Sequence, residues 1–137
     1  MKVVEKIESA KHIVLVLTGN GRWERRILQG LAPKYDHDVL LFFPPTRGIT
    51  GLIALQALKQ YAKMGISFLR EITVLFLIDK EHFRTENYLN EVRGKMLTIG
   101  IRVISAKELD DGVYFIKASS GPRTFHVYIA VLGVRKI

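Results

Sequence analysis

Residues 71–83 read EITVLFLIDKEHF, and the rest of the chain can be placed around this stretch. From Ile72 to Ile78, six of seven side chains are apolar, and several are β-branched or aromatic. A continuous apolar run of this length is typical of a central parallel strand that is covered on both faces. The run ends at Asp79, and ligands of open α/β sheets bind beyond the carboxyl ends of such strands. The sequence therefore predicts a functional site close to Asp79.

Apolar runs separated by amphipathic stretches predict that strands and helices alternate along the chain. Further strands are expected at 12–17, 38–43 and 101–104, and helices at 2–10, 22–31, 51–64 and 85–99. Residues 113–118 and 124–132 flank the turn cluster Ser119–Pro122, which predicts a β-hairpin with a loop of four to six residues. Strand–helix alternation implies right-handed crossovers and a parallel sheet.

These elements predict an α/β fold, a three-layer sandwich whose mainly parallel central sheet is flanked by helices. A C-terminal antiparallel β-hairpin at about 112–133 is expected as an addition to that sandwich. The chain of 137 residues has the size of one domain, so we expect residues 1–137 to form a single unit.

Composition narrows the class of partner. The formal net charge is +8, which favours nucleic acid, a nucleotide or an acidic protein, although charge of this kind also serves solubility alone. With no cysteine, the chain has no disulfide, thiolate nucleophile or cysteine zinc site. The longest apolar runs fall far short of a membrane span, and the N-terminus lacks a signal-peptide pattern. We therefore expect a cytoplasmic protein without membrane association, and the Lys, Arg, Ile and Val content suits a thermophile.

Cationic residues gather in the loops that follow the expected strands. Carboxyl ends of parallel strands share one edge of a sheet, where helix N-termini add N–H donors for phosphate. The residues predicted to bind phosphate or nucleic acid at this edge are Gly19, Gly21, Arg22, Arg25, Arg47, Lys80 and Arg84. The alternative is that the arginines lie on solvated helix faces. Glu24 stands where a dinucleotide fingerprint needs its third glycine, so Thr18–Gly21 is better explained as a tight turn.

Asp79 and Glu81 are two residues apart at the end of the central strand. Alternate residues of a strand point the same way, and paired carboxylates suit Mg²⁺ or Mn²⁺. The sequence thus predicts a metal site on Asp79 and Glu81. The alternative is that Asp79 caps the following helix while Glu81 pairs with Lys80 or Arg84. Asp79, Glu81 and His82 are the candidate catalytic residues, with His82 as a general base.

Two segments resemble the Toprim domain of primases, topoisomerases and related nucleases. Ile13–Gly19 is similar to the strand that ends in Glu-Gly in that family, and Val74–Glu81 is similar to the strand that ends in Asp-x-Asp. The resemblance covers roughly residues 11–105 and implies a nucleic-acid or nucleotide ligand and Mg²⁺ on the acidic pair. Thr18 replaces the family's glutamate and Glu81 its second aspartate, which implies a weakened catalytic centre.

Three functions follow from these observations. The first is a Toprim-like domain that binds nucleic acid or nucleotide phosphate. The second is a non-catalytic interaction module or homo-oligomer that assembles through the hairpin, whose strands are apolar on both faces. The third is a small nucleotide phosphohydrolase that uses the same edge of the sheet.

Overall fold

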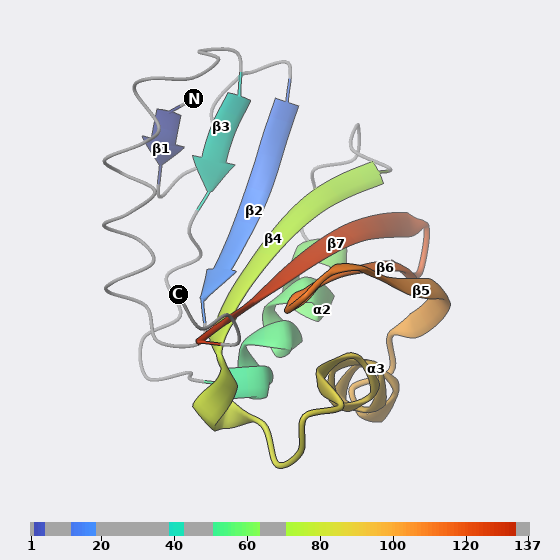
Figure 1. The fold of residues 1–137 in the computed structure, drawn as a ribbon. Coiled ribbons are helices and arrows are strands. Elements are labelled where there is room, and N and C mark those ends of the chain that lie inside the picture. Colours follow the sequence, from blue (N-terminus) through green and yellow to red (C-terminus); the bar gives the residue numbers. More distant parts are fainter. Residues whose placement is uncertain (1, 5–11, 19–38, 43–50, 64–70, 134–137) are drawn as a thin grey trace.

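The computed structural model describes residues 2–4, 12–18, 39–42, 51–63 and 71–133 (Figure 1). The strands are β1 (Lys2–Val4), β2 (His12–Thr18), β3 (Val39–Phe42), β4 (Glu71–Asp79), β5 (Arg102–Asp110), β6 (Val113–Ser120) and β7 (Arg123–Leu132). The helices are the 3₁₀ turns η2 (Gly51–Leu55) and η3 (Lys80–His82) and the α-helices α2 (Gln56–Lys63) and α3 (Tyr88–Thr98). None of the helices in these described ranges is long and apolar enough to cross a membrane.

All of the described strands belong to one mixed sheet in the order β1-β3-β2-β4-β7-β6-β5. The pairings from β1 through β7 in this order are parallel, whereas β7, β6 and β5 run antiparallel to one another. The longest pairing joins β4 and β7, with residues 71–79 opposite 124–132. The carboxyl ends of β4 and β7 therefore lie side by side.

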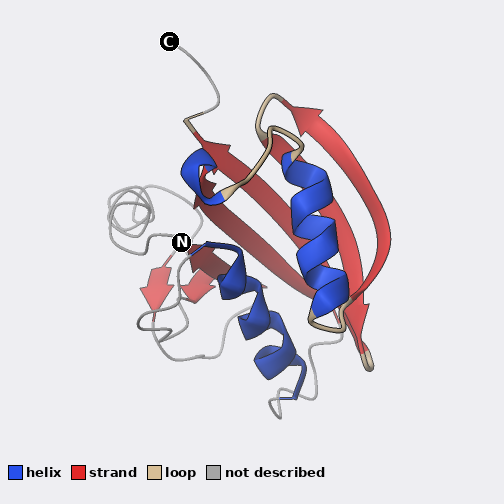
Figure 2. Ribbon diagram, turned by 90° about the horizontal axis from the view of Figure 1, so that it is seen from below, coloured by secondary structure: helices blue, strands red, loops and turns tan. Residues whose placement is uncertain are grey.

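The predicted three-layer sandwich, with a mainly parallel sheet flanked by helices and a hairpin added to it, is wrong. The sheet is mixed, and the described helices α2 and α3 lie on the same face of it (Figure 2). Strands β6 and β7 do form an antiparallel hairpin, but β7 lies between β4 and β6, so the hairpin is part of the sheet. The physical reason is that β7 buries Phe125, Val127 and Ile129 against the helices, and burying this apolar face favours an interior strand over an edge strand.

The core lies between the sheet and its helices. Along β4, Ile72, Val74, Phe76 and Ile78 are buried, while the alternate residues are exposed or half-buried. The expectation that this strand is covered on both faces does not hold for its whole length. The core cluster also contains Leu55 and Leu58 of the η2–α2 segment and Val92 and Met96 of α3. Along β4, β7 and β6, the face toward the helices is therefore buried, and the opposite face is partly open to solvent.

Local predictions differ from the structure at several elements. Lys2–Val4 form a strand that pairs with β3, whereas a helix was expected over 2–10. The expected strand 101–104 extends to Asp110. The β6–β7 turn is shorter than expected, because Ser120 pairs with Arg123 and leaves Gly121 and Pro122 as its tip. Gly121 has a φ of +60°, a conformation that glycine adopts readily at a tight hairpin. The helix expected over 22–31 lies outside the described residues.

Candidate functional site

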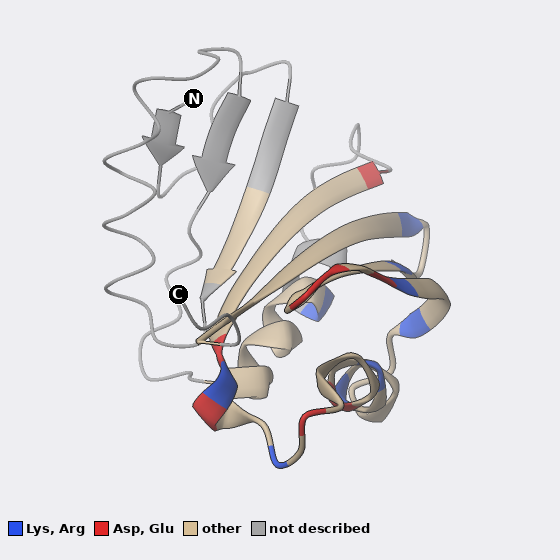
Figure 3. Cartoon of the chain, in the orientation of Figure 1, with Lys and Arg blue, Asp and Glu red and all other residues tan. Residues whose placement is uncertain are grey.

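Asp79 ends β4 and starts the turn that positions the site. Its Oδ1 accepts a hydrogen bond from the backbone nitrogen of Glu81 at 3.3 Å, and Asp79 thereby caps η3. The backbone nitrogen of Phe83 donates to the carbonyl oxygen of Lys80 at 3.1 Å and closes the turn. Figure 3 shows the acidic and basic residues of η3 following directly on β4. Capping by Asp79 is the expected alternative to metal binding.

The two carboxylates predicted to share a metal ion face different partners. Glu81 is well exposed, and its Oε1 lies 3.8 Å from Nε2 of His82, whereas Asp79 caps the backbone. Side chains two apart point the same way only in an extended chain, and the chain turns into a 3₁₀ helix immediately after Asp79. Within the described ranges, no cluster of three or more acidic or histidine side chains suits a metal ion. The two side chains are therefore not aligned as a strand would align them, and a Mg²⁺ or Mn²⁺ site on Asp79 and Glu81 stays a prediction.

Lys80 lies at the same edge but toward β7. A Cβ atom added to Gly133 would lie 3.5 Å from Cγ, Cδ and Cε of Lys80, so the lysine stem passes close over the end of β7. Lys80 is exposed and does not line the pocket described next. Its ammonium group adds positive charge to the carboxyl ends of β4 and β7.

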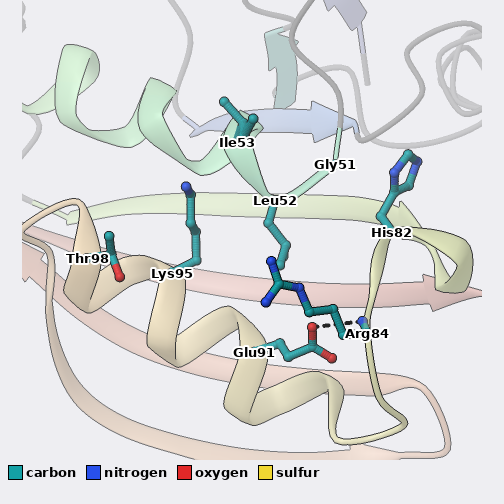
Figure 4. A pocket seen from close by; sticks show the side chains of 8 residues that line it. All are labelled: Gly51, Leu52, Ile53, His82, Arg84, Glu91, Lys95 and Thr98. Carbon is teal, nitrogen blue, oxygen red and sulfur yellow. Dashed lines mark hydrogen bonds between the residues drawn. The ribbon is translucent and has the colours of Figure 1, made fainter.

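A pocket of about 600 Å³ opens between η2 and α3, next to the segment that follows η3 (Figure 4). Its lining residues come from three elements that are distant in sequence: Gly51, Leu52, Ile53, His82, Arg84, Glu91, Lys95 and Thr98. Figure 4 shows the side chains of Arg84 and Lys95 extending toward Leu52 and Ile53, with His82 at one end. Apolar and cationic groups therefore face the same cavity.

Glu91 fixes the segment that carries Arg84. Its Oε1 accepts the backbone N–H of Arg84 at 2.9 Å, and its Oε2 accepts the backbone N–H and the hydroxyl of Thr85 at 3.0 and 3.2 Å. Burial works against ionisation of Glu91, but these hydrogen bonds and the charge of Arg84 outweigh it and lower the pKa of the carboxyl group. The carboxylate is thus ionised near neutral pH and is already engaged with protein donors.

His82 packs closely against the start of η2. Gly51 has a φ of +65°, and a Cβ atom added there would lie 3.2 Å from Nδ1 of His82. Real Cβ atoms rarely come this close to a neighbour, and the positive φ disfavours other residues as well. Glycine at position 51 therefore lets the imidazole form one wall of the pocket.

The balance of charge in the pocket is positive. Arg84 and Lys95 are cationic, His82 gains charge on protonation, and Glu91 is the one acidic side chain among the described residues that line it. The carboxylate of Glu91 accepts three hydrogen bonds from backbone and hydroxyl donors, so its negative charge is partly offset. An anion with an apolar portion matches this lining.

The structure brings together only part of the predicted site. His82 and Arg84 line the pocket, and Asp79, Lys80 and Glu81 lie at the strand end beside it. The predicted residues Gly19, Gly21, Arg22, Arg25 and Arg47 lie outside the described residues. Sequence reasoning missed Glu91, Lys95 and Thr98 on α3. Their spacing of four and three residues places them on one helical face, and that spacing is the signal that could have grouped them.

We compared the chain with known protein families, curated proteins and solved structures. A scan of protein-family models and searches of curated proteins and of solved structures found no match to the chain.

Proposed function

We propose that the chain binds a phosphate-bearing ligand of about nucleotide size, either a free nucleotide or one unit of a nucleic acid, in the pocket between η2 and α3. The observation that carries this proposal is the convergence of His82, Arg84 and Lys95 on one cavity whose carboxylate is held by backbone donors.

The chemistry of the lining supports this ligand class. A guanidinium group presents a planar fork of donors to phosphate, and an ammonium group acts as a point charge. Leu52 and Ile53 supply an apolar wall for the remainder of the ligand, and Ile53 is 48% exposed. A volume of about 600 Å³ lies within the range of small-molecule sites. The net charge of +8 favours encounter with such an anion.

The resemblance of Ile13–Gly19 and Val74–Glu81 to Toprim segments supports the same ligand class, and we retain the Toprim relationship as a proposal. Our proposal concerns binding and includes no metal-dependent step, because Asp79 and Glu81 face different partners. The phosphohydrolase alternative needs phosphate release from a bound nucleotide and is tested in the same samples as binding.

The test is a titration of a fluorescent ATP analogue, with unlabelled ATP, GTP and inorganic phosphate as competitors, against Arg84→Ala, Lys95→Ala and the double variant. Alanine at position 84 keeps the backbone N–H that Glu91 accepts, so the segment should stay in place. Arg93→Ala is the matched control, because Arg93 is exposed on α3 but does not line the pocket.

We expect each pocket variant to weaken binding by roughly tenfold or more, since a charge-assisted hydrogen bond contributes about 1.5–3 kcal/mol. The control should change affinity by less than about twofold. Equal losses in the control and the pocket variants, or no saturable binding at low salt, would contradict the proposal. Release of phosphate that requires Lys95 would support the phosphohydrolase alternative.

Self-association is a second candidate function. The strand order favours the edge strand β5, and not the β6–β7 hairpin, as the place where two chains would pair. Strands β6 and β7 have neighbours on both sides, whereas β5 is one of the two outermost strands of the order. Ile104 and Leu109 of β5 are 50% and 46% exposed, and unpaired edge strands with apolar side chains pair readily with other chains. Light scattering of the wild type and of Ile104→Lys tests this candidate. A monomeric wild type at high concentration would remove it.

A further inference from the structure

The face of the sheet opposite α2 and α3 carries aromatic and cationic side chains. Along β6 and β7, residues alternate between the buried face and this open face. The open-face residues in the middle of these strands are Phe115, Lys117, His126 and Tyr128, of which Tyr128 is 43% exposed. Figures 1 and 2 show α2 and α3 on one face of β4, β7, β6 and β5, and the residues that alternate with the buried ones face away from these helices.

The rings form a connected group. The ring centroids of Phe115 and Tyr128 are 5.0 Å apart, and Phe115 and His126 stack at 6.2 Å with planes inclined by 24°. Phe115 pairs directly with Tyr128 across the two strands, and His126 is its diagonal neighbour. Nε2 of His126 lies 3.7 Å from Oε1 of Glu71, which restrains the imidazole at one border of the group. The half-exposed ring of Tyr128, inclined by 53° to the Phe115 ring that supports it, offers a surface on which a base can stack.

The strand register places lysines beside these rings. One row across the sheet holds Lys107, Phe115, Tyr128 and Leu75, and the next holds Ser105, Lys117, His126 and Thr73. Nζ of Lys107 lies 5.9 Å from the centroid of Phe115, within the range of a cation–π contact. These two central rows contain no carboxylate. Acidic residues of this face, Asp110 and Glu71, belong to the rows on either side.

We propose that this face, which we call the aromatic face (Lys107, Phe115, Lys117, His126 and Tyr128), binds single-stranded nucleic acid. Base stacking on exposed rings and neutralisation of phosphates by neighbouring cations are the two elements of single-strand binding sites. The bases of a duplex are paired and stacked on one another and cannot reach a flat sheet face. The aromatic face therefore favours a single strand over a duplex.

This inference goes beyond the proposed function, because the aromatic face and the pocket lie on opposite sides of the sheet. A loss of binding in Arg84→Ala/Lys95→Ala concerns the pocket, whereas a loss in variants of Tyr128 or Lys117 concerns the aromatic face. The two proposals can therefore fail separately.

The test measures fluorescence anisotropy with labelled single strands of RNA and of DNA, about 12 nucleotides long, and with the duplex of the same sequence. Tyr128→Ala removes an exposed ring, and Tyr128→Phe keeps it. Leu132→Ala is the matched control, since Leu132 is 36% exposed on the same strand but outside the two central rows. A second variant, Lys107→Ala/Lys117→Ala, removes the charges without touching the rings, and Arg93→Ala on α3 is its control.

We expect Tyr128→Ala to weaken single-strand binding at least about fivefold, because stacking on one ring contributes substantially to each bound base. Tyr128→Phe and Leu132→Ala should stay within about twofold of the wild type. The lysine double variant should flatten the dependence of log K on log salt by about 1.4, since each of two phosphate contacts with a single strand contributes about 0.7.

Three results would overturn the inference: duplex bound as tightly as the single strand, affinity unchanged in both Tyr128→Ala and the lysine double variant, or no single-strand binding at low salt. A dimer that dissociates in Tyr128→Ala would assign the face to a second copy of the chain and would overturn it as well. If Tyr128→Ala does not fold, the lysine double variant tests the inference, and a salt dependence equal to that of the wild type overturns it. Preference for RNA or for DNA identifies the source of the strand, and either supports the inference.

Discussion

The backbone nitrogen of Arg84 lies 2.9 Å from Oε1 of Glu91, seven residues later in the chain. Glu91 also accepts two hydrogen bonds from Thr85, whose hydroxyl in turn accepts the backbone N–H of Asn87 at 3.2 Å. One side chain of α3 thus holds the whole segment between η3 and the helix. Because Arg84 and Glu91 both line the pocket, the same contact links stability to the arrangement of the site.

Glu91→Ala should lower the free energy of unfolding by about 1–3 kcal/mol, the cost of leaving donors without a charged acceptor. It should also weaken ligand binding in the pocket, because Arg84 loses its anchor. Denaturant unfolding and the nucleotide titration measure the two effects. Glu86→Ala is the control, since Glu86 is exposed in the same segment and does not line the pocket. Equal stability of the wild type and Glu91→Ala would contradict the anchoring role.

The ionisation of Glu91 should also make the free energy of unfolding fall in acid. The pKa of Glu91 is lowered in the folded protein from the ordinary value of 4.5, because the hydrogen bonds from Arg84 and Thr85 and the charge of Arg84 outweigh the opposing effect of burial. A lowered pKa means that the unfolded chain binds a proton before the folded one does. The contribution is complete above pH 4.5 and is lost as the pH falls through the lowered pKa.

The measurement for this prediction is the free energy of unfolding between neutral pH and about pH 3. The wild type should lose more stability over this interval than Glu91→Gln, which cannot ionise. Parallel pH profiles in the two proteins would show that the carboxylate contributes nothing specific to acid sensitivity.

Two glycines should respond to alanine with opposite signs. Gly51→Ala should destabilise by about 1–2 kcal/mol, because φ is +65° and the new Cβ meets His82 at 3.2 Å. Gly94→Ala is the matched control within α3, where nothing lies within 4 Å of the new methyl group, and it should stabilise by about 0.5–1 kcal/mol. Thermal unfolding measures both. A shift of the His82 imidazole resonances in Gly51→Ala alone would confirm the contact at the pocket.

The apolar run of β4 could be recognised in the sequence, but its surroundings could not. Ile72 to Ile78 form a strand as predicted, and Asp79 ends it. A continuous apolar run does not distinguish a strand covered on both faces from one that leaves Leu75 and Leu77 half-exposed. That difference depends on which strands and helices pack beside it, and the pairing with β7 joins residues about fifty positions apart.

The extension of β5 has a local signal in the sequence. Asp111 and Gly112 separate β5 from β6, and Gly112 has a φ of +71°. An Asp-Gly pair between runs of β-forming residues is a strong hairpin signal. It implies a meander of three strands where a single hairpin was predicted.

The sequence could place the pocket residues that follow β4 but not those that reach the pocket through packing of distant elements. Residues directly after β4, such as His82 and Arg84, could be placed from the end of the strand alone. Lys95 and Leu52 join them only because α3 and η2 pack on the same face of the sheet. The prediction of a metal site shared by Asp79 and Glu81 stays a prediction, although the extended geometry from which it was argued stops at Asp79.

The ionisation of Tyr114 should make the free energy of unfolding fall in alkali. This side chain is 8% exposed, with the ring of Tyr88 at 6.4 Å, and burial together with the charges of Glu108, Tyr88 and Asp111 raises its pKa above the ordinary value of 10.0. The folded protein then keeps a proton that the unfolded chain has already released. The free energy of unfolding should therefore decline as the pH rises from 10.0 through the raised pKa. Tyr114→Phe has no proton to lose, so its stability should decline less steeply than that of the wild type in denaturant titrations over this interval. Identical declines would show that the phenol of Tyr114 ionises as readily in the folded protein as in the unfolded chain.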